Sequence, residues 1–89
     1  MTDEKVPRAL PATRAFTAAD IGKVIRTRRK ALGYTQVWFA ELMSMSPRLV
    51  SEIERGKQTV GIQKVLSLLT ALGIDLTLVV RESSREDNG

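Results

Sequence analysis

The sequence predicts an all-α domain of four helices, followed by one C-terminal β-strand that pairs with its copy across a homodimer. Apolar residues recur at helical spacing between residues 17 and 72, which predicts the helices. Glycines end three of the periodic segments, as is typical of helix C-termini; they are Gly33, Gly56 and Gly73. After the last glycine, apolar and polar residues alternate with a period of two, which predicts the strand.

Composition excludes several classes of protein. The chain has 89 residues, of which 43% are hydrophobic and 27% charged, as in ordinary globular domains. Its longest apolar run, residues 37–40, is far shorter than the roughly 20 residues of a membrane-spanning helix, so we expect no membrane partner. Because Cys and His are both absent, a thiol nucleophile, a Cys/His zinc site and a histidine base are excluded. We therefore expect a cytoplasmic protein that is not an enzyme and needs no metal or cofactor.

The positive charge lies in the middle of the chain. Fourteen basic residues face 10 acidic ones, for a net charge of +4. Residues 17–64 alone carry nine basic and four acidic residues, so the basic excess belongs to this central region. Such an excess favours a polyanionic partner, although a solvated helix face is the alternative. We assign only a minor steering role to the surface charges Lys23, Arg26 and Lys30.

Four regions are expected along the chain. Residues 1–16 contain two prolines and no apolar period, which predicts a flexible arm. Residues 17–74 form the helical domain, residues 75–81 the strand, and residues 82–89 a disordered tail. The strand has no candidate partner within the chain, and a lone strand leaves its backbone groups unpaired, so we expect it to pair with a second copy.

The first helix begins after Thr17, which forms a variant capping box with Asp20. Gly33 ends it. Its expected inward-facing residues are Ile21, Val24, Ile25, Arg28 and Leu32. A fourth helix is expected from Ile62 to Leu72, with an inner face of Ile62, Val65, Leu66, Leu69 and Leu72.

Two short helices lie between these. Thr35 caps the second helix, and Ser46 caps the third, in which Pro47 takes the first position. Only residues 44–46 separate the two, enough for a tight turn. The expected inner residues are Phe39, Ala40, Met43, Val50 and Ile53. Two short helices joined by such a turn behind a longer helix form a helix-turn-helix.

About a dozen positions between residues 17 and 74 agree in type and spacing with one known family. They are Gly33-Tyr34-Thr35-Gln36, Phe39-Ala40, Ser46, Val50-Ser51, Ile53-Glu54, Arg55-Gly56-Lys57 and Leu72-Gly73-Ile74. In these residues the chain resembles the phage-repressor/Cro-like (Xre) helix-turn-helix family, which implies a four-helix lambda-repressor-like fold. The chain departs from the family at Ser44, where the turn usually carries a glycine because the position commonly needs a positive φ.

The order of four helices, one strand and a polar tail resembles HipB-type antitoxins. That resemblance implies a homodimer paired through its strands, which represses its own operon and binds a HipA-type kinase toxin. Two alternatives stay open: a stand-alone Xre-type regulator, and a protein-interaction adaptor that does not bind DNA.

The expected DNA-reading surface is the third helix, whose N-terminal end favours phosphate. Arg48 is placed to reach guanine O6 and N7, and Glu52, one turn later, to accept from cytosine N4. The alternative is that these two residues pair with each other. The resemblance implies a phosphate contact for Gln36. The full set of expected DNA contacts is Gln36, Ser46, Pro47, Arg48, Ser51, Glu52, Arg55 and Lys57.

Three further sets of residues receive other roles. The resemblance implies a partly buried ion pair between Arg29 and Glu54, joining the first and third helices. Trp38 and Leu42 point away from the inner face of the second helix and are candidates for contact with a protein partner. The expected dimer interface consists of Leu68, Ala71, Leu76, Leu78 and Val80.

Overall fold

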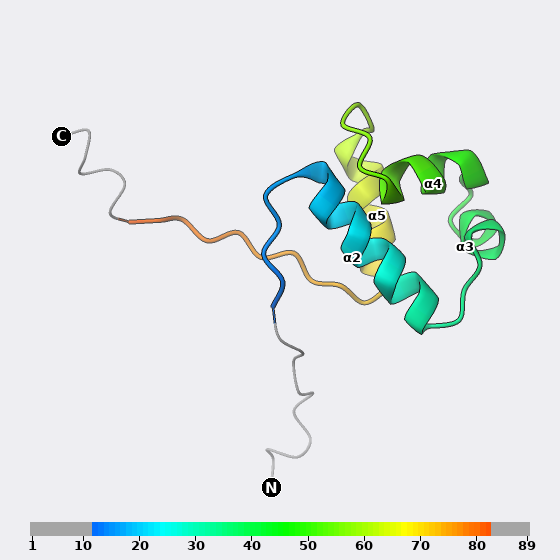
Figure 1. Ribbon diagram of the computed structural model, residues 1–89, viewed down its shortest axis with the longest axis horizontal. Coiled ribbons are helices and arrows are strands. Elements are labelled where there is room, and N and C mark those ends of the chain that lie inside the picture. The colour runs from blue at the N-terminus through cyan, green and yellow to red at the C-terminus, as the bar shows by residue number, and fades with distance from the viewer. Residues whose placement is uncertain (1–11, 83–89) are drawn as a thin grey trace, which may run out of the picture.

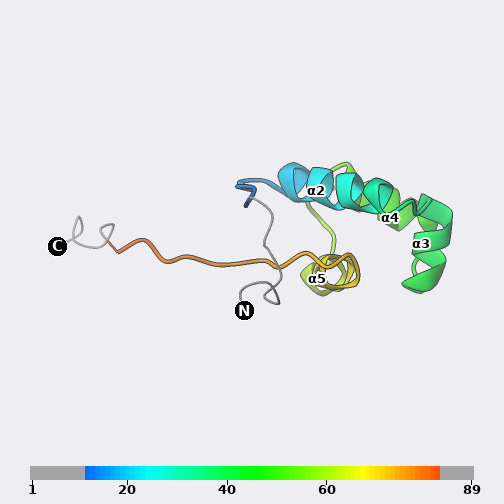
Figure 2. The ribbon, with the colours of Figure 1, turned by 90° about the horizontal axis from the view of Figure 1, so that it is seen from below.

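Four helices pack in two layers. The computed structural model describes residues 12–82, in which the helices are α2 (Ala18–Ala31), α3 (Gln36–Leu42), α4 (Pro47–Glu54) and α5 (Ile62–Ala71). Figure 1 and Figure 2 show α2 and α4 in one layer, with α3 at its end and α5 in the second layer beneath α2. The predicted four-helix fold is therefore confirmed. No helix within residues 12–82 is long and apolar enough to cross a membrane.

Side-chain caps begin three of the helices. At α2, Thr17 Oγ1 accepts from the Asp20 N–H at 3.1 Å, and Asp20 Oδ2 accepts from the N–H groups of Thr17 (3.1 Å) and Phe16 (2.8 Å). The backbone N–H of Phe16 is the main reason why the pKa of Asp20 is lowered. Thr35 and Ser46 cap α3 and α4 in the same way, each accepting at 3.0 Å from a backbone N–H one turn ahead. All three predicted caps are thus confirmed.

The turn between α3 and α4 passes through the left-handed region at Ser44, whose φ is 58°. The Ser44 N–H donates to the Glu41 carbonyl at 3.1 Å, and the Met45 N–H donates to the Ala40 carbonyl at 2.8 Å. These bonds close the C-terminus of α3 and fix the angle at which α4 begins. The positive φ expected here is present, in a residue whose Cβ makes it unfavourable.

The core brings together one apolar side of each helix. Its buried members are Ile25, Phe39, Ala40, Val50, Ile53, Leu68, Leu69 and Leu72. α2 and α4 approach closely at Gly22, where an added Cβ would lie only 2.3 Å from the Ile53 carbonyl oxygen. Gly56, with φ at 91°, lies equally close to the backbone of Ala19. These two glycines therefore allow the end of α4 to rest directly on the first turns of α2.

Three expectations about burial are wrong. Leu68 is fully buried, so it belongs to the core and is not available for a dimer interface. Ile62, expected to face inward, is 70% exposed, because the buried stripe of α5 runs through Leu68, Leu69 and Leu72 and so lies one residue away from the expected phase. Leu32, the C-cap of α2, is also largely outside the core.

Residues 75–82 form neither helix nor strand and extend away from the domain (Figure 1). Leu76, Leu78 and Val80 are 50%, 85% and 90% exposed, and Ala71 is exposed at the end of α5. A strand needs a neighbour for its hydrogen bonds, so the pairing expected at residues 75–81 stays a prediction about two chains. The expected arm lies largely, and the expected tail almost wholly, outside the described residues.

Candidate nucleic-acid interface

The N-terminal half of α4 presents several of the expected contact residues to solvent. Ser46 and Pro47 are exposed at its start, and the side chain of Arg48 is 86% exposed. Ser46 Oγ accepts from the Leu49 N–H, which leaves the hydroxyl hydrogen to donate outward. The opposite side of α4 is buried through Val50 and Ile53. The helix is therefore fixed by its apolar side with its polar side outward.

Glu52 is held between two cations on this surface. Its Oε2 accepts from Arg48 Nε at 3.3 Å, and its Oε1 accepts from Lys57 Nζ at 3.4 Å. Partial removal from water would raise the pKa of Glu52, but the hydrogen bonds from these two cations outweigh it and the pKa is lowered. Glu52 is therefore an anion at neutral pH, and the alternative of a pair between Arg48 and Glu52 is what the free chain adopts.

A buried cluster lies directly behind this surface. Arg29 donates to Glu54 through Nε (2.6 Å) and Nη2 (3.1 Å), and both residues are almost fully buried. A further Arg29 nitrogen, Nη1, donates to the Tyr34 carbonyl at 2.7 Å. The expected ion pair is thus present as a two-pronged contact. It fixes α2 to α4 and to the loop before α3.

Gln36 is attached to the same cluster, because its Nε2 donates to Glu54 Oε1 at 2.9 Å. Its second Nε2 hydrogen and its carbonyl stay available to a ligand. Together with Arg26, Ser51 and Arg55, Gln36 and Glu54 line a hollow between α2, α3 and α4. The guanidinium of Arg55 donates to Ser51 Oγ at its edge. The hollow thus offers amide, hydroxyl and guanidinium donors from three helices.

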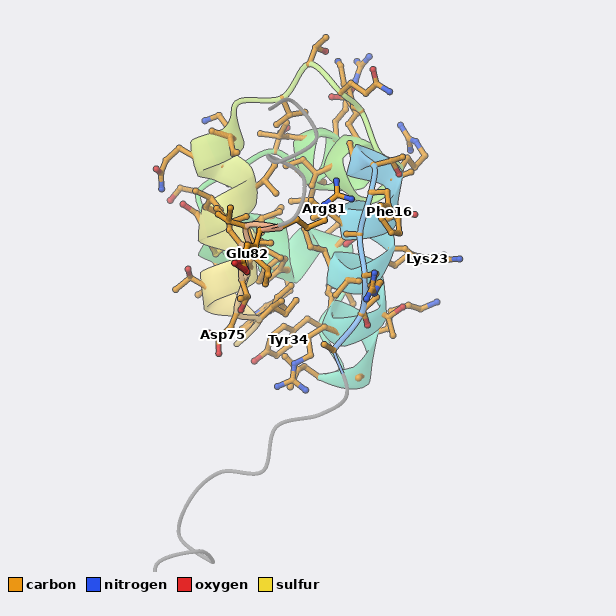
Figure 3. All side chains as sticks on the ribbon, turned by 90° about the vertical axis from the view of Figure 1, so that its left-hand side faces the viewer. Phe16, Lys23, Tyr34, Asp75, Arg81 and Glu82 are labelled. Carbon is orange, nitrogen blue, oxygen red and sulfur yellow. The ribbon has the colours of Figure 1, made fainter. Side chains whose placement is uncertain are left out.

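Sequence reasoning missed two arginines. Arg28 Nε donates to the Leu72 carbonyl at 2.9 Å and so fixes the end of α5 to α2, whereas the periodicity only placed Arg28 beside the apolar face. Arg26 was expected to act only in steering, yet it lines the hollow with Gln36. Both placements depend on how helices meet, which no local pattern reveals. Lys23, by contrast, points away from the helical body (Figure 3).

Trp38 and Leu42 form an apolar strip on the outer side of α3. Trp38 is 49% exposed and Leu42 57% exposed. The ring of Trp38 lies against Tyr34, with the two centroids 4.7 Å apart. Trp38 is therefore partly packed and partly open, and Leu42 is the more open of the two.

Two helices separated by a tight turn, with the second one outward and α2 behind it, define a helix-turn-helix domain. The helix-turn-helix family model matches residues 25–79. The chain therefore belongs to this family and is a helix-turn-helix transcriptional regulator of the Xre type. This agrees with the resemblance in the sequence.

Individual relatives agree with this assignment. The chain is 33% identical over 75 residues to y4mF of Sinorhizobium fredii, described as an uncharacterized HTH-type transcriptional regulator; the match covers 84% of this chain and 99% of that protein. The restriction-modification controller protein C.AhdI from Aeromonas hydrophila is 33% identical, with a TM-score of 0.57 over 65% of this chain and 84% of that one. HipB in a complex with the O2 20mer is similar in fold, at 15% identity and a TM-score of 0.71 over 81% of this chain and all of that one.

Proposed function

We propose that the protein is a sequence-specific repressor that binds double-stranded DNA as a homodimer, with α4 in the major groove. The observation that carries this proposal is the outward face of α4, where Arg48 is 86% exposed on a helix fixed from behind by a buried ion pair. An α-helix fits the major groove, and a rigid helix with an exposed arginine near its N-terminus suits base reading.

Base contacts come from Arg48 and Glu52. Arg48 reaches guanine O6 and N7, and Glu52 accepts from cytosine N4. The two residues are linked in the free chain by an exposed contact of 3.3 Å, which is weak enough to be exchanged for contacts to bases. Pro47 has no N–H to donate and packs against a thymine methyl or a sugar.

Phosphate contacts surround these base contacts. Gln36 is oriented by Glu54, and its free amide hydrogen faces the hollow that Arg26, Ser51 and Arg55 also line. A phosphate oxygen is an acceptor only, so it suits this set of donors. Lys57, beyond α4, and the hydroxyl of Ser46, before it, supply two further contacts.

The dimer forms through residues 75–81, paired antiparallel about a two-fold axis, with Ala71 at its edge. The support is the exposure of Leu76, Leu78 and Val80, three apolar side chains that a second chain would cover. Two copies place two α4 helices on one duplex, which gives a two-fold symmetric operator.

Two substitutions test the reading of DNA. Arg48→Ala removes a base contact, so we expect a loss of roughly 1–3 kcal/mol on the operator and relaxed preference at one base pair. Lys57→Ala removes a phosphate contact, so it weakens all sequences alike and lowers the salt slope by about one unit. If Arg48→Ala weakens operator and random DNA equally, Arg48 is a phosphate ligand and the assignment of the reading residue is wrong.

A narrower proposal is that the protein is the antitoxin of a type II toxin–antitoxin pair with a HipA-type kinase toxin. It is supported by the fold shared with HipB in a HipA–HipB–operator complex, at a TM-score of 0.70, and by an extended segment after the fourth helix. Trp38 and Leu42 are the proposed contact with that partner. Co-expression with a kinase-like protein encoded beside this gene tests it. A stable complex lost in Leu42→Asp supports the antitoxin, and failure to associate favours a stand-alone regulator.

A further inference from the structure

Glu52 lies among three cations on the surface proposed to meet DNA. Arg48 and Lys57 are hydrogen-bonded to its two oxygens, at 3.3 and 3.4 Å. Arg55 lines a shallow hollow with Glu52 and Lys57. The Glu52 side chain is only 17% exposed, so the cations on either side largely cover it. Within residues 12–82, no other carboxylate forms ion pairs with two cations.

Arg48 and Lys57 thus point at an internal anion in the free chain. A DNA phosphate must compete with Glu52 for each of them, because one cation contacting both anions holds two like charges close together. The carboxylate also adds a negative charge to a surface that approaches a negative backbone. Both effects weaken binding to phosphate alone. Neither effect is offset on random DNA, whereas a cytosine N4 donor can satisfy Glu52 at a cognate site.

We propose that Glu52 is a specificity-determining residue that suppresses binding to non-cognate DNA by holding Arg48 and Lys57 away from phosphates. This inference rests on the proposed function, since it concerns the same surface. It assigns Glu52 a role that the reading of one base does not include. Discrimination then comes from an unfavourable term at wrong sites as well as from favourable contacts at the right one.

Glu52→Gln tests the inference, because it removes the charge and keeps the shape. Binding is measured against salt concentration on a random duplex and on the DNA upstream of the gene. We expect the variant to bind the random duplex several-fold more tightly and with a salt dependence steeper by about one unit, as for one added net charge. Affinity for the upstream DNA should not rise by the same factor, so the specificity ratio falls.

Glu41→Gln is the matched control. It removes the same charge from an exposed position on α3 that forms no ion pair within residues 12–82. If both variants raise affinity for the random duplex equally, the effect is one of net charge and the inference is wrong. An unchanged affinity of Glu52→Gln for the random duplex, in a variant whose melting curve shows it folded, also overturns it.

A double-mutant cycle tests the route through Arg48. If Glu52 acts by holding Arg48, Glu52→Gln should raise random-duplex affinity by a smaller factor in an Arg48→Ala background than in the wild type. Equal factors in both backgrounds would contradict that route. The proposed function fails separately, when the wild-type chain does not prefer upstream to random DNA, and the random duplex tests the role of Glu52 in that case too. If neither wild type nor variant binds any duplex, both proposals are wrong.

Discussion

Glu54 connects three helices through one carboxylate. It lies on α4 and accepts from Arg29 on α2 and from Gln36 on α3, and it is almost fully buried. A buried charge is tolerated only when its partners are in place. The relative positions of the three helices that form the proposed DNA surface therefore depend on this residue.

Glu54→Ala should be severe, because it leaves the Arg29 guanidinium buried without its counter-charge. We expect a loss of roughly 3–5 kcal/mol in the free energy of unfolding, measured by urea denaturation. The double variant Arg29→Met/Glu54→Leu removes both charges and should lose less. A loss below about 1 kcal/mol for Glu54→Ala, the range of surface pairs, would contradict a buried pair.

Ser44→Gly should stabilise the protein. Ser44 adopts a φ of 58°, where a Cβ is unfavourable and glycine is not. We expect the free energy of unfolding to rise by about 1 kcal/mol, with Ser44→Ala as a control that keeps the Cβ and gives no such gain. If glycine and alanine give the same stability, the turn stores no strain at this residue.

At the scale of elements, the first turn of α2 depends on a charged cap. Asp20 accepts from two backbone N–H groups, and those bonds lower its pKa in the folded state. A group whose pKa is lower in the folded state stabilises the protein above its unfolded pKa, near about 4, and loses that contribution as the pH falls through the folded value.

Asp20→Asn should therefore change how stability depends on pH. We expect the wild type to exceed the variant at pH 6 and the difference between them to shrink as the pH is lowered below about 4. Urea midpoints at the two pH values measure this. A difference that stays constant across that range would mean that the charge of Asp20 does not contribute to the cap.

Much of each helix could be predicted from local signals, and the contacts between helices could not. The caps at Thr17, Thr35 and Ser46 follow from side chains that bond within one turn, so the sequence alone predicts them. The burial of Leu68 depends on which side of α5 meets the other layer, and a shift of one residue in phase made that prediction wrong. The contact of Gln36 with Glu54 spans 18 residues and leaves no local pattern.

At the scale of the whole molecule, the extended C-terminal segment needs a partner. Deleting residues 75–89 should give a monomer with weaker operator affinity, because two half-sites are no longer bound together. Deleting residues 83–89 alone keeps the apolar segment and serves as the control, which should remain a dimer. Sedimentation measures both. A dimer that persists after the longer deletion would place the interface elsewhere.

The central claim is that α4 reads DNA from the major groove, and competition binding tests it most directly. The full chain is mixed with labelled DNA from upstream of its own gene and challenged with unlabelled random duplex over a range of salt concentrations. We predict binding that weakens steeply with salt and a preference of roughly 10³-fold or more for the upstream site. Equal affinity for both duplexes, or no binding to either, would contradict the account.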